Sequence, residues 1–179
     1  MTGLKHMGKR NSAIIFRGVV VDMEQFEAEV GSKGWHTFQV VRHPGGVGVL
    51  PLHDDGTVTL IRQYRPAIDA CILEIPAGRL GSGEAPAACG ERELLEETGL
   101  RANELIPLGE FLSSPGVFDE LIHLYAATGL IQDRPQPEDD EEIETIRLPL
   151  AEALQMAHDG RISDGKTLAA LFRGSEVRP

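Results

Sequence analysis

Residues 78–100 read GRLGSGEAPAACGERELLEETGL, a glycine-rich loop followed by a short amphipathic segment. Proline suits the first turn of a helix and glycine its left-handed end, so the segment predicts a helix over residues 86–98. Glu93, Glu96 and Glu97 are three and four residues apart and share one face of that helix. Crowded carboxylates repel one another unless a cation lies between them, and oxygen ligands favour Mg²⁺ or Mn²⁺ over zinc. The stretch therefore predicts a metal site that handles phosphates.

The composition limits the classes of protein to consider. A chain of 179 residues fits one domain with a small extra element and can bury a core. Its formal charge of −11 argues against broad binding to nucleic acid or to an anionic membrane, so an anionic substrate needs a metal and a few placed arginines. Apolar runs such as 47–52 are too short to span a bilayer, and the basic, polar start predicts a cytoplasmic protein. Cys71 and Cys89 have no partner at zinc-ligand spacing.

Strand-like segments surround the predicted helix. Strands are expected within 12–30 and at 35–42, 47–52, 58–63, 70–75, 104–112, 121–126 and 143–148, with helices near 150–158 and 166–172. Between two of the strands, Asp54-Asp55-Gly56 is a strong hairpin signal. This order predicts an α+β fold with a mixed sheet and one central helix. We expect residues 1–43 to form an N-terminal β segment and residues 44–179 the main domain.

The loop and helix resemble the Nudix box at every defining position: Gly78-x5-Glu84-x7-Arg92-Glu93-Leu94-x-Glu96-Glu97-x-Gly99-Leu100. The resemblance implies the Nudix fold, an α/β/α sandwich with a mixed sheet, and hydrolysis of a nucleoside diphosphate linked to another group. It also implies a set of metal ligands, namely the carbonyl of Ala77 with the carboxylates of Glu93, Glu97 and Glu96. Arg92 is expected to pair with Glu84 and to fix its orientation. The alternative is a solvated acidic helix face with no metal.

The flanking segments resemble the ADP-ribose pyrophosphatase branch of that family. They are IRQYRP at 61–66 and LEIPAG at 73–78, together with Pro115, which follows Leu100 by 15 residues. The acidic tract 138–144 matches the loop from which this branch draws its catalytic base. The likeness covers most of the chain, although its motifs are less specific outside the box.

The resemblance assigns substrate contacts by position. Arg65 is expected to pair with a substrate phosphate, because a guanidinium fork suits that task, although it could merely cap its strand. Arg79 and the loop residues Ser114, Pro115 and Gly116 are the other expected substrate contacts.

Five glutamates are the catalytic candidates that the resemblance implies. Glu120 lies where the branch has a carboxylate facing the terminal ribose or a metal-bound water, and the alternative is an exposed glutamate at the start of a strand. Glu141 is the first choice for the general base, with Glu142 and Glu144 as competitors because a loop can shift by one residue. Glu96 is counted both as a metal ligand and as a catalytic residue.

Two aromatic residues in the N-terminal segment are candidates for stacking on adenine. They are Trp35 and Phe38, and the alternative is an ordinary core position in a strand. In the ADP-ribose pyrophosphatase branch this segment commonly reaches across a two-fold dimer, so the resemblance implies a homodimer.

Together these expectations describe Mg²⁺-assisted cleavage of ADP-ribose or related sugars to AMP and a sugar 5-phosphate, with Mn²⁺ as an alternative metal. Three alternatives stay open. They are a GDP-mannose or other nucleotide-sugar pyrophosphatase, a nucleoside triphosphate pyrophosphohydrolase, and a regulator that binds ADP-ribose without hydrolysing it. The last is disfavoured because every glutamate of the box is present.

Overall fold

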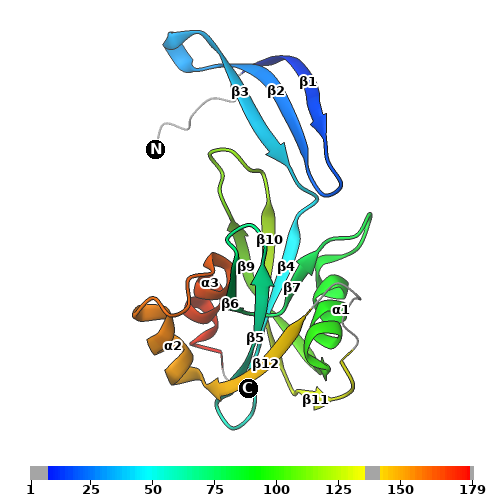
Figure 1. The fold of residues 1–179 in the computed structure, drawn as a ribbon, viewed down its shortest axis with the longest axis vertical. Helices are drawn as coiled ribbons and strands as arrows, with labels where there is room; N and C mark the ends of the chain where they lie inside the picture. Colours follow the sequence, from blue (N-terminus) through cyan, green and yellow to red (C-terminus); the bar gives the residue numbers. More distant parts are fainter. Residues whose placement is uncertain (1–7, 136–141, 178–179) are drawn as a thin grey trace. The chain divides into compact units, whose positions relative to one another are not determined.

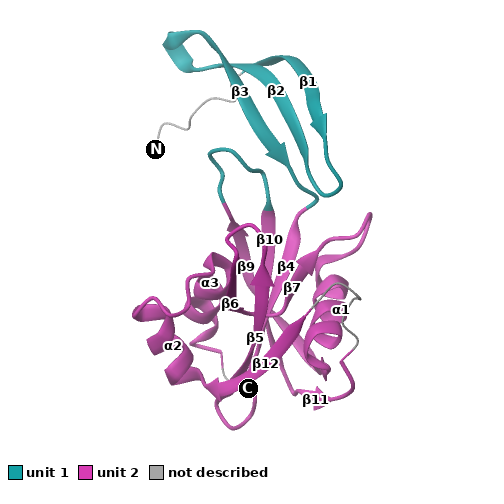
Figure 2. Ribbon diagram, viewed as in Figure 1, with its two compact units in different colours: residues 1–44, 114–120 teal, residues 45–113, 121–179 magenta. Residues whose placement is uncertain are grey.

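The computed structural model describes residues 8–135 and 142–177. The chain divides into two compact units, which Figure 2 shows in different colours. Unit 1 contains residues 1–44 and the loop 114–120, and unit 2 contains residues 45–113 and 121–179.

Unit 1 is a three-stranded antiparallel sheet in the order β1-β2-β3. Its strands are β1 (Lys9–Arg17), β2 (Asp22–Glu29) and β3 (Trp35–Arg42), with a short 3-10 turn, η1 (Gly31–Lys33), before β3. The loop 114–120 joins this unit because Val41 N–H donates to the Val117 carbonyl at 2.8 Å and Asp119 N–H donates to the Val41 carbonyl at 3.2 Å. A loop that follows a strand of unit 2 is thereby fixed to the end of β3.

Unit 2 holds the rest of the secondary structure. A four-stranded sheet has the order β7-β4-β10-β9, and a three-stranded sheet has the order β12-β5-β6. β4 and β10 are parallel while the other pairs of these two sheets are antiparallel. The elements are β4 (Gly46–Pro51), β5 (Thr57–Arg65), β6 (Ala70–Glu74), β7 (Ala77–Arg79), α1 (Pro86–Thr98), β8 (Leu100–Arg101), β9 (Glu104–Leu112), β10 (Leu121–Thr128), β11 (Ile131–Gln132), β12 (Ile143–Pro149), α2 (Leu150–His158) and α3 (Gly165–Gly174).

The strands of unit 2 lie between two helical layers. In Figure 1, α1 covers one side of the strands, and α2 and α3 cover the other. Because successive side chains of β4 point to opposite faces, this strand contacts both helical layers. Val47 and Val49 pack in the hydrophobic cluster that contains residues of α1, whereas Leu50 packs in the cluster that contains residues of α2 and α3. The predicted α/β/α arrangement with a mixed sheet is confirmed.

The central helix has the predicted bounds. Pro86 occupies its first turn, and Gly99 ends it with a φ of 68° while its N–H donates to the Leu95 carbonyl. A left-handed residue at this position favours glycine, which explains the sharp stop.

The expected hairpin at Asp54-Asp55-Gly56 is only partly formed. The chain does reverse there, since His53 N–H donates to the Thr57 carbonyl at 2.9 Å, and one bridge joins Leu52 to Val58. The flanking strands then separate, because β4 pairs with β7 and β10 while β5 pairs with β6 and β12. The prediction of two paired strands was wrong: each strand finds other partners, and the turn connects two different sheets.

No helix among the described residues is long and apolar enough to cross a membrane.

Candidate metal and diphosphate site

Glu93 and Glu97 point from α1 toward the loop and strand that precede it. Glu93 is 9% exposed and its carboxylate occupies the space in which a Cβ on residue 78 would stand, so a side chain at this position would displace that carboxylate. Glu97 is 3% exposed, and its Oε2 accepts a hydrogen bond from Ala77 N–H at 2.8 Å. Two carboxylates one helical turn apart are therefore held beside the backbone of residues 77 and 78.

Arg92 joins the acidic side chains of the loop and the helix. Its Nε donates to Glu84 Oε1 at 3.0 Å, and its Nη1 lies 2.7 Å from Glu93 Oε1 and 2.8 Å from Glu96 Oε2. The hydrogen bond from Arg92, with a second from Gly81 N–H, lowers the pKa of Glu84 to about 2. The predicted pair of Arg92 with Glu84 is confirmed, and the same guanidinium also balances the charge of the helix face.

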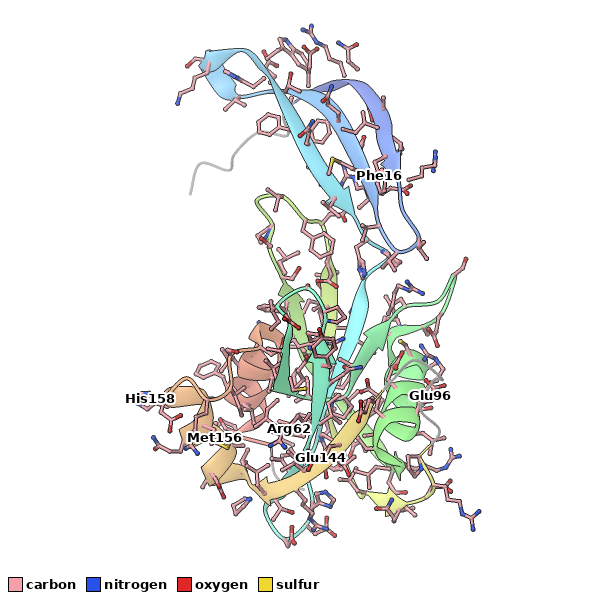
Figure 3. The ribbon with its side chains drawn as sticks, viewed as in Figure 1. Phe16, Arg62, Glu96, Glu144, Met156 and His158 are labelled. Carbon is pink, nitrogen blue, oxygen red and sulfur yellow. The ribbon has the colours of Figure 1, made fainter. Side chains whose placement is uncertain are left out.

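Oxygen donors of the kind that Mg²⁺ prefers are thus gathered on one side of α1 (Figure 3 labels Glu96). In the part of the chain that the structure describes, no three His, Cys, Asp or Glu side chains converge as a preformed ligand set. The physical reason is visible in the contacts: Glu93 and Glu96 turn toward Arg92, and Glu97 turns toward Ala77 N–H. The oxygen donors fit a divalent cation, and Gly78 leaves room for one of them, the Glu93 carboxylate. In this structure Arg92 balances the charge of Glu93 and Glu96.

A cavity of about 670 Å³ opens beside Glu93 and Glu96, whereas the predicted ligand Glu97 is not part of its lining. This volume lies within the range of small-molecule sites. Five of the predicted site residues line it, together with neighbouring loop residues: Arg65, Ala77, Arg79, Glu93 and Glu96, then Gly78, Leu80, Gly81, Glu84 and Arg92. Cationic and anionic side chains therefore face the same space, as binding of a metal and a diphosphate requires.

Arg65 is held by a carboxylate that the sequence did not single out. Its Nε donates to Glu74 Oε1 at 2.6 Å and its Nη2 donates to Glu74 Oε2 at 2.7 Å. Burial favours the neutral form of Glu74, but the hydrogen bond from Arg65 and the charge of Lys166 outweigh it and lower the pKa of this carboxyl. Glu74 could have been noticed as the one charged residue in an apolar strand, since a buried charge needs a partner. Lys166 carries no such signal.

The predicted stacking residues lie on β3 in unit 1. The guanidinium carbon of Arg10 stands 4.1 Å from the centroid of the Trp35 ring, a cation–π contact. Phe38 stacks on Phe26 with ring centroids 6.0 Å apart. Both predicted residues are partly exposed, Trp35 by 37% and Phe38 by 39%, so each ring retains surface for a ligand.

The predicted loop residues Ser114, Pro115 and Gly116 are exposed and also belong to unit 1. The Ser114 carbonyl accepts hydrogen bonds from the N–H groups of residues 117 and 118, which closes the turn. Glu120 lies at the end of the loop, and its Oε1 is 3.4 Å from His43 Nδ1. The carboxylate of Glu120 is therefore oriented by a side chain that follows β3.

The candidates for the general base fall in three different places. Glu141 lies outside the described residues. Glu142 is exposed and directly precedes β12. Glu144 lies opposite Arg62 in the register of β12 with β5 and accepts a hydrogen bond from it at 2.7 Å (Figure 3). Because side chains alternate along β5, Arg62 points away from the face that carries Arg65, which disfavours Glu144 as the base.

The family comparison agrees with this geometry, because the NUDIX domain matches residues 42–171. The chain belongs to the NUDIX domain family. Over 159 residues it is 39% identical to the methanol dehydrogenase activator of Bacillus methanolicus and 35% identical to the ADP-ribose pyrophosphatase of Bacillus subtilis (strain 168). Each of these alignments covers 88% of this chain and 86% of the relative.

Another relative is the GDP-mannose pyrophosphatase of Yersinia enterocolitica, 33% identical over 84% of this chain and 94% of that protein. A crystal structure described as an ADP compounds hydrolase superimposes with a TM-score of 0.84, covering 98% of this chain and 96% of the other at 22% identity, which supports the fold. The prediction of a Nudix hydrolase resembling the ADP-ribose pyrophosphatases is confirmed.

Proposed function

We propose that this Nudix hydrolase cleaves the diphosphate of ADP-ribose, or of related ADP-sugars, to AMP and a sugar 5-phosphate. The observation that carries the proposal is the cavity of unit 2, in which Arg65 and Arg79 face the carboxylates of the Nudix box. Relatives named ADP-ribose pyrophosphatase, at 35% and 31% identity, support the choice of substrate.

Binding of the diphosphate is assigned to the two arginines. Arg65 offers the part of its guanidinium that Glu74 does not engage, and Arg79 lines the same cavity. Planar guanidinium groups match the geometry of phosphate oxygens and keep their charge at every physiological pH. These residues orient the diphosphate and offset its charge.

The metal is assigned to the Ala77 carbonyl and to Glu93, Glu96 and Glu97, with Mg²⁺ as the first choice and Mn²⁺ as the alternative. When bound there, a divalent cation supplies charge neutralisation of the diphosphate and a lower pKa for water. Gly78 leaves room for the Glu93 carboxylate, and Ala77 N–H orients Glu97. One water molecule is consumed as a phosphorus–oxygen bond of the diphosphate breaks.

The general base is assigned to the acidic segment before β12, with Glu141 first and Glu142 second. Glu120 is assigned to the terminal ribose or to water, with His43 as its positioning partner. A correctly placed carboxylate base contributes about a hundred- to ten-thousand-fold to the rate.

The quaternary assignment is a homodimer built through unit 1, in which either Trp35 or Phe38 stacks on adenine. Exposure of both rings and of apolar residues on β1 supports this assignment. The cytoplasmic location expected from the sequence stays a prediction.

A GDP-mannose pyrophosphatase is the second candidate, because a relative of that name is 33% identical over most of both chains. Product analysis by anion-exchange chromatography, with ADP-ribose, GDP-mannose and ATP supplied separately with Mg²⁺, tests the choice. We expect AMP from ADP-ribose, with kcat/KM at least about tenfold above that for the other two compounds. A higher kcat/KM for GDP-mannose would instead support the second candidate function, a GDP-mannose pyrophosphatase. Tight binding of ADP-ribose without any product would favour a regulator.

A further inference from the structure

Glu74 is a buried charge at the end of β6, three residues before Ala77. It is 1% exposed, and Arg65 from β5 binds it through two nitrogens at 2.6 and 2.7 Å. Lys166 from α3 donates to the Oε2 atom of the same carboxylate. A carboxylate in a dry interior is costly unless it is fully paired, so both cations are needed to keep Glu74 charged.

Residues in and just before α3 hold the other side of this cluster in place. The Lys166 side chain is 11% exposed, and its Nζ also lies 3.1 Å from Asp164 Oδ2. Asp164 caps α3 by accepting from Thr167 N–H at 2.9 Å. The Thr167 hydroxyl in turn accepts from Ile75 N–H at 2.9 Å. The first turn of α3 is therefore fixed to two successive residues of the chain just before the metal-site loop.

Arg65 stands between this cluster and the cavity. Its Nε and Nη2 are occupied by Glu74, and its Nη1 makes no hydrogen bond within residues 8–135 and 142–177. The residue lines the cavity together with Ala77, Glu93 and Glu96. A long, flexible side chain is thus given one orientation by Glu74, a carboxylate that does not line the cavity.

The two cations share Glu74 Oε2, which makes the orientation of Arg65 depend on Lys166. Without the ammonium group, Arg65 is the single cation in contact with a fully buried carboxylate. Its remaining donors would then turn toward Glu74, because an unsatisfied buried charge is more costly than a lost contact at an open cavity. The guanidinium would move away from the diphosphate.

We propose that Lys166 is a positioning residue, which acts through Glu74 to keep Arg65 directed at the substrate diphosphate. This inference rests on the proposed function, since it takes Arg65 as the ligand of that diphosphate. It gives α3, which contributes no residue to the lining of the cavity, a role in substrate binding.

The test is the substitution Lys166→Met, which keeps the length of the aliphatic stem and removes the charge. With ADP-ribose and saturating Mg²⁺, we expect KM to rise about tenfold while kcat changes less than about threefold. The affinity for ADP, measured by calorimetry, should fall by the same factor. Lys166→Arg restores the charge and should recover most of the affinity, whereas the matched control Lys33→Met, on η1 of unit 1, should behave as wild type.

A second variant separates positioning from stability. In Glu74→Gln/Lys166→Met no buried charge is left unpaired, so the melting temperature should return toward that of wild type. The KM should stay raised, because Arg65 has lost the carboxylate that orients it.

Two results would overturn the inference in distinguishable ways. If wild type hydrolyses ADP-ribose and both variants keep its KM and its ADP affinity, Lys166 is only structural and the proposed function stands. If wild type neither binds nor hydrolyses ADP-ribose, the proposed function and the inference fall together.

Discussion

At the residue scale, Gly78 lies directly against the carboxylate of Glu93, one of the proposed metal ligands. Gly78 has no side chain, and the Glu93 carboxylate fills the space that a Cβ would occupy. The φ angle of Gly78 is not in the left-handed region, so the need for glycine here comes from space alone. This distinguishes Gly78 from Gly99, whose φ of 68° is the reason for glycine at the end of α1.

Gly78→Ala tests this fit. The new methyl group would force the Glu93 carboxylate out of its place, and we expect kcat/KM for ADP-ribose to fall about a hundredfold. Since the end of a glutamate is flexible, the free energy of unfolding should drop by only about 1 kcal/mol. Steady-state kinetics and urea unfolding of the same preparation measure both quantities.

Two variants serve as controls, the single substitution Glu93→Ala and the double substitution Gly78→Ala/Glu93→Ala. The double variant should be no worse than Glu93→Ala, because the two substitutions damage the same interaction. If the losses in kcat/KM of the two single variants multiply in the double variant, Gly78 acts on something other than Glu93.

Residues within the box could be predicted because their spacing is local. A helix repeats every three to four residues, so Glu93, Glu96 and Glu97 had to share a face, and Arg92 was close enough to reach Glu84. The cluster of Glu74 with Lys166 could not be predicted, because 92 residues separate the partners and only the fold brings them together. The loop around Ser114 joins unit 1 for the same kind of reason.

At the scale of elements, a buried charged side chain connects the strands of the unit 1 sheet. Glu24 on β2 is the one buried residue among the described residues of that unit. Hydrogen bonds from Lys9 and Ser12, and then from Arg42, outweigh burial and lower the pKa of Glu24 from 4.5 to about 2. Arg42 continues the network to Asp119 at 2.8 Å, which links β3 to the loop.

This lowered pKa predicts how the stability of unit 1 depends on pH. Unfolded Glu24 binds its proton near pH 4.5 and folded Glu24 only near pH 2, so its contribution is complete above pH 4.5 and is lost between these values. Fluorescence of Trp35, the single tryptophan and a residue of β3, follows unfolding of this unit. Glu24→Gln should lower the urea midpoint at neutral pH and flatten its decline in acid.

Glu29→Gln, at the exposed end of β2, is the matched control and should keep the wild-type decline. An unchanged acid dependence in Glu24→Gln would show that the ion cluster does not stabilise the sheet.

Element bounds agreed closely with expectation where turn residues mark them, as Pro86 and Gly99 mark α1. Strand pairing was harder to predict. The turn at Asp54-Asp55-Gly56 was recognised, but the partners of β4 and β5 are set by residues far along the chain, so the paired hairpin was wrong.

At the scale of the whole molecule, no apolar side chain in the described part of unit 1 is buried. The apolar side chains of Ile15, Phe16 and Val20 are 47%, 61% and 49% exposed. A lone three-stranded sheet needs an apolar face packed against something to be stable. A second copy of the chain is the partner that our proposal assigns to this surface.

Light scattering coupled to size exclusion tests the homodimer. We expect a mass about twice the 19.5 kDa of one chain. Phe16→Glu places a charge in the proposed interface and should yield monomers, with a matching fall in ADP-ribose hydrolysis. Phe172→Glu on α3 of unit 2, where the ring is 79% exposed, is the control and should leave the mass unchanged. A monomeric wild type at micromolar concentration would exclude the dimer.

The central claim is that the acidic face of α1 holds a divalent cation against a diphosphate. AMP release from ADP-ribose, measured against Mg²⁺ concentration for wild type, Glu97→Gln and the exposed control Glu91→Gln, tests it most directly. Wild type and the control should lose activity with a chelator and regain it with Mg²⁺. Glu97→Gln, which can still accept from Ala77 N–H, should remain folded by circular dichroism yet lose about a hundredfold or more in rate. A Glu97→Gln enzyme with the wild-type rate at the same Mg²⁺ concentration would contradict the account.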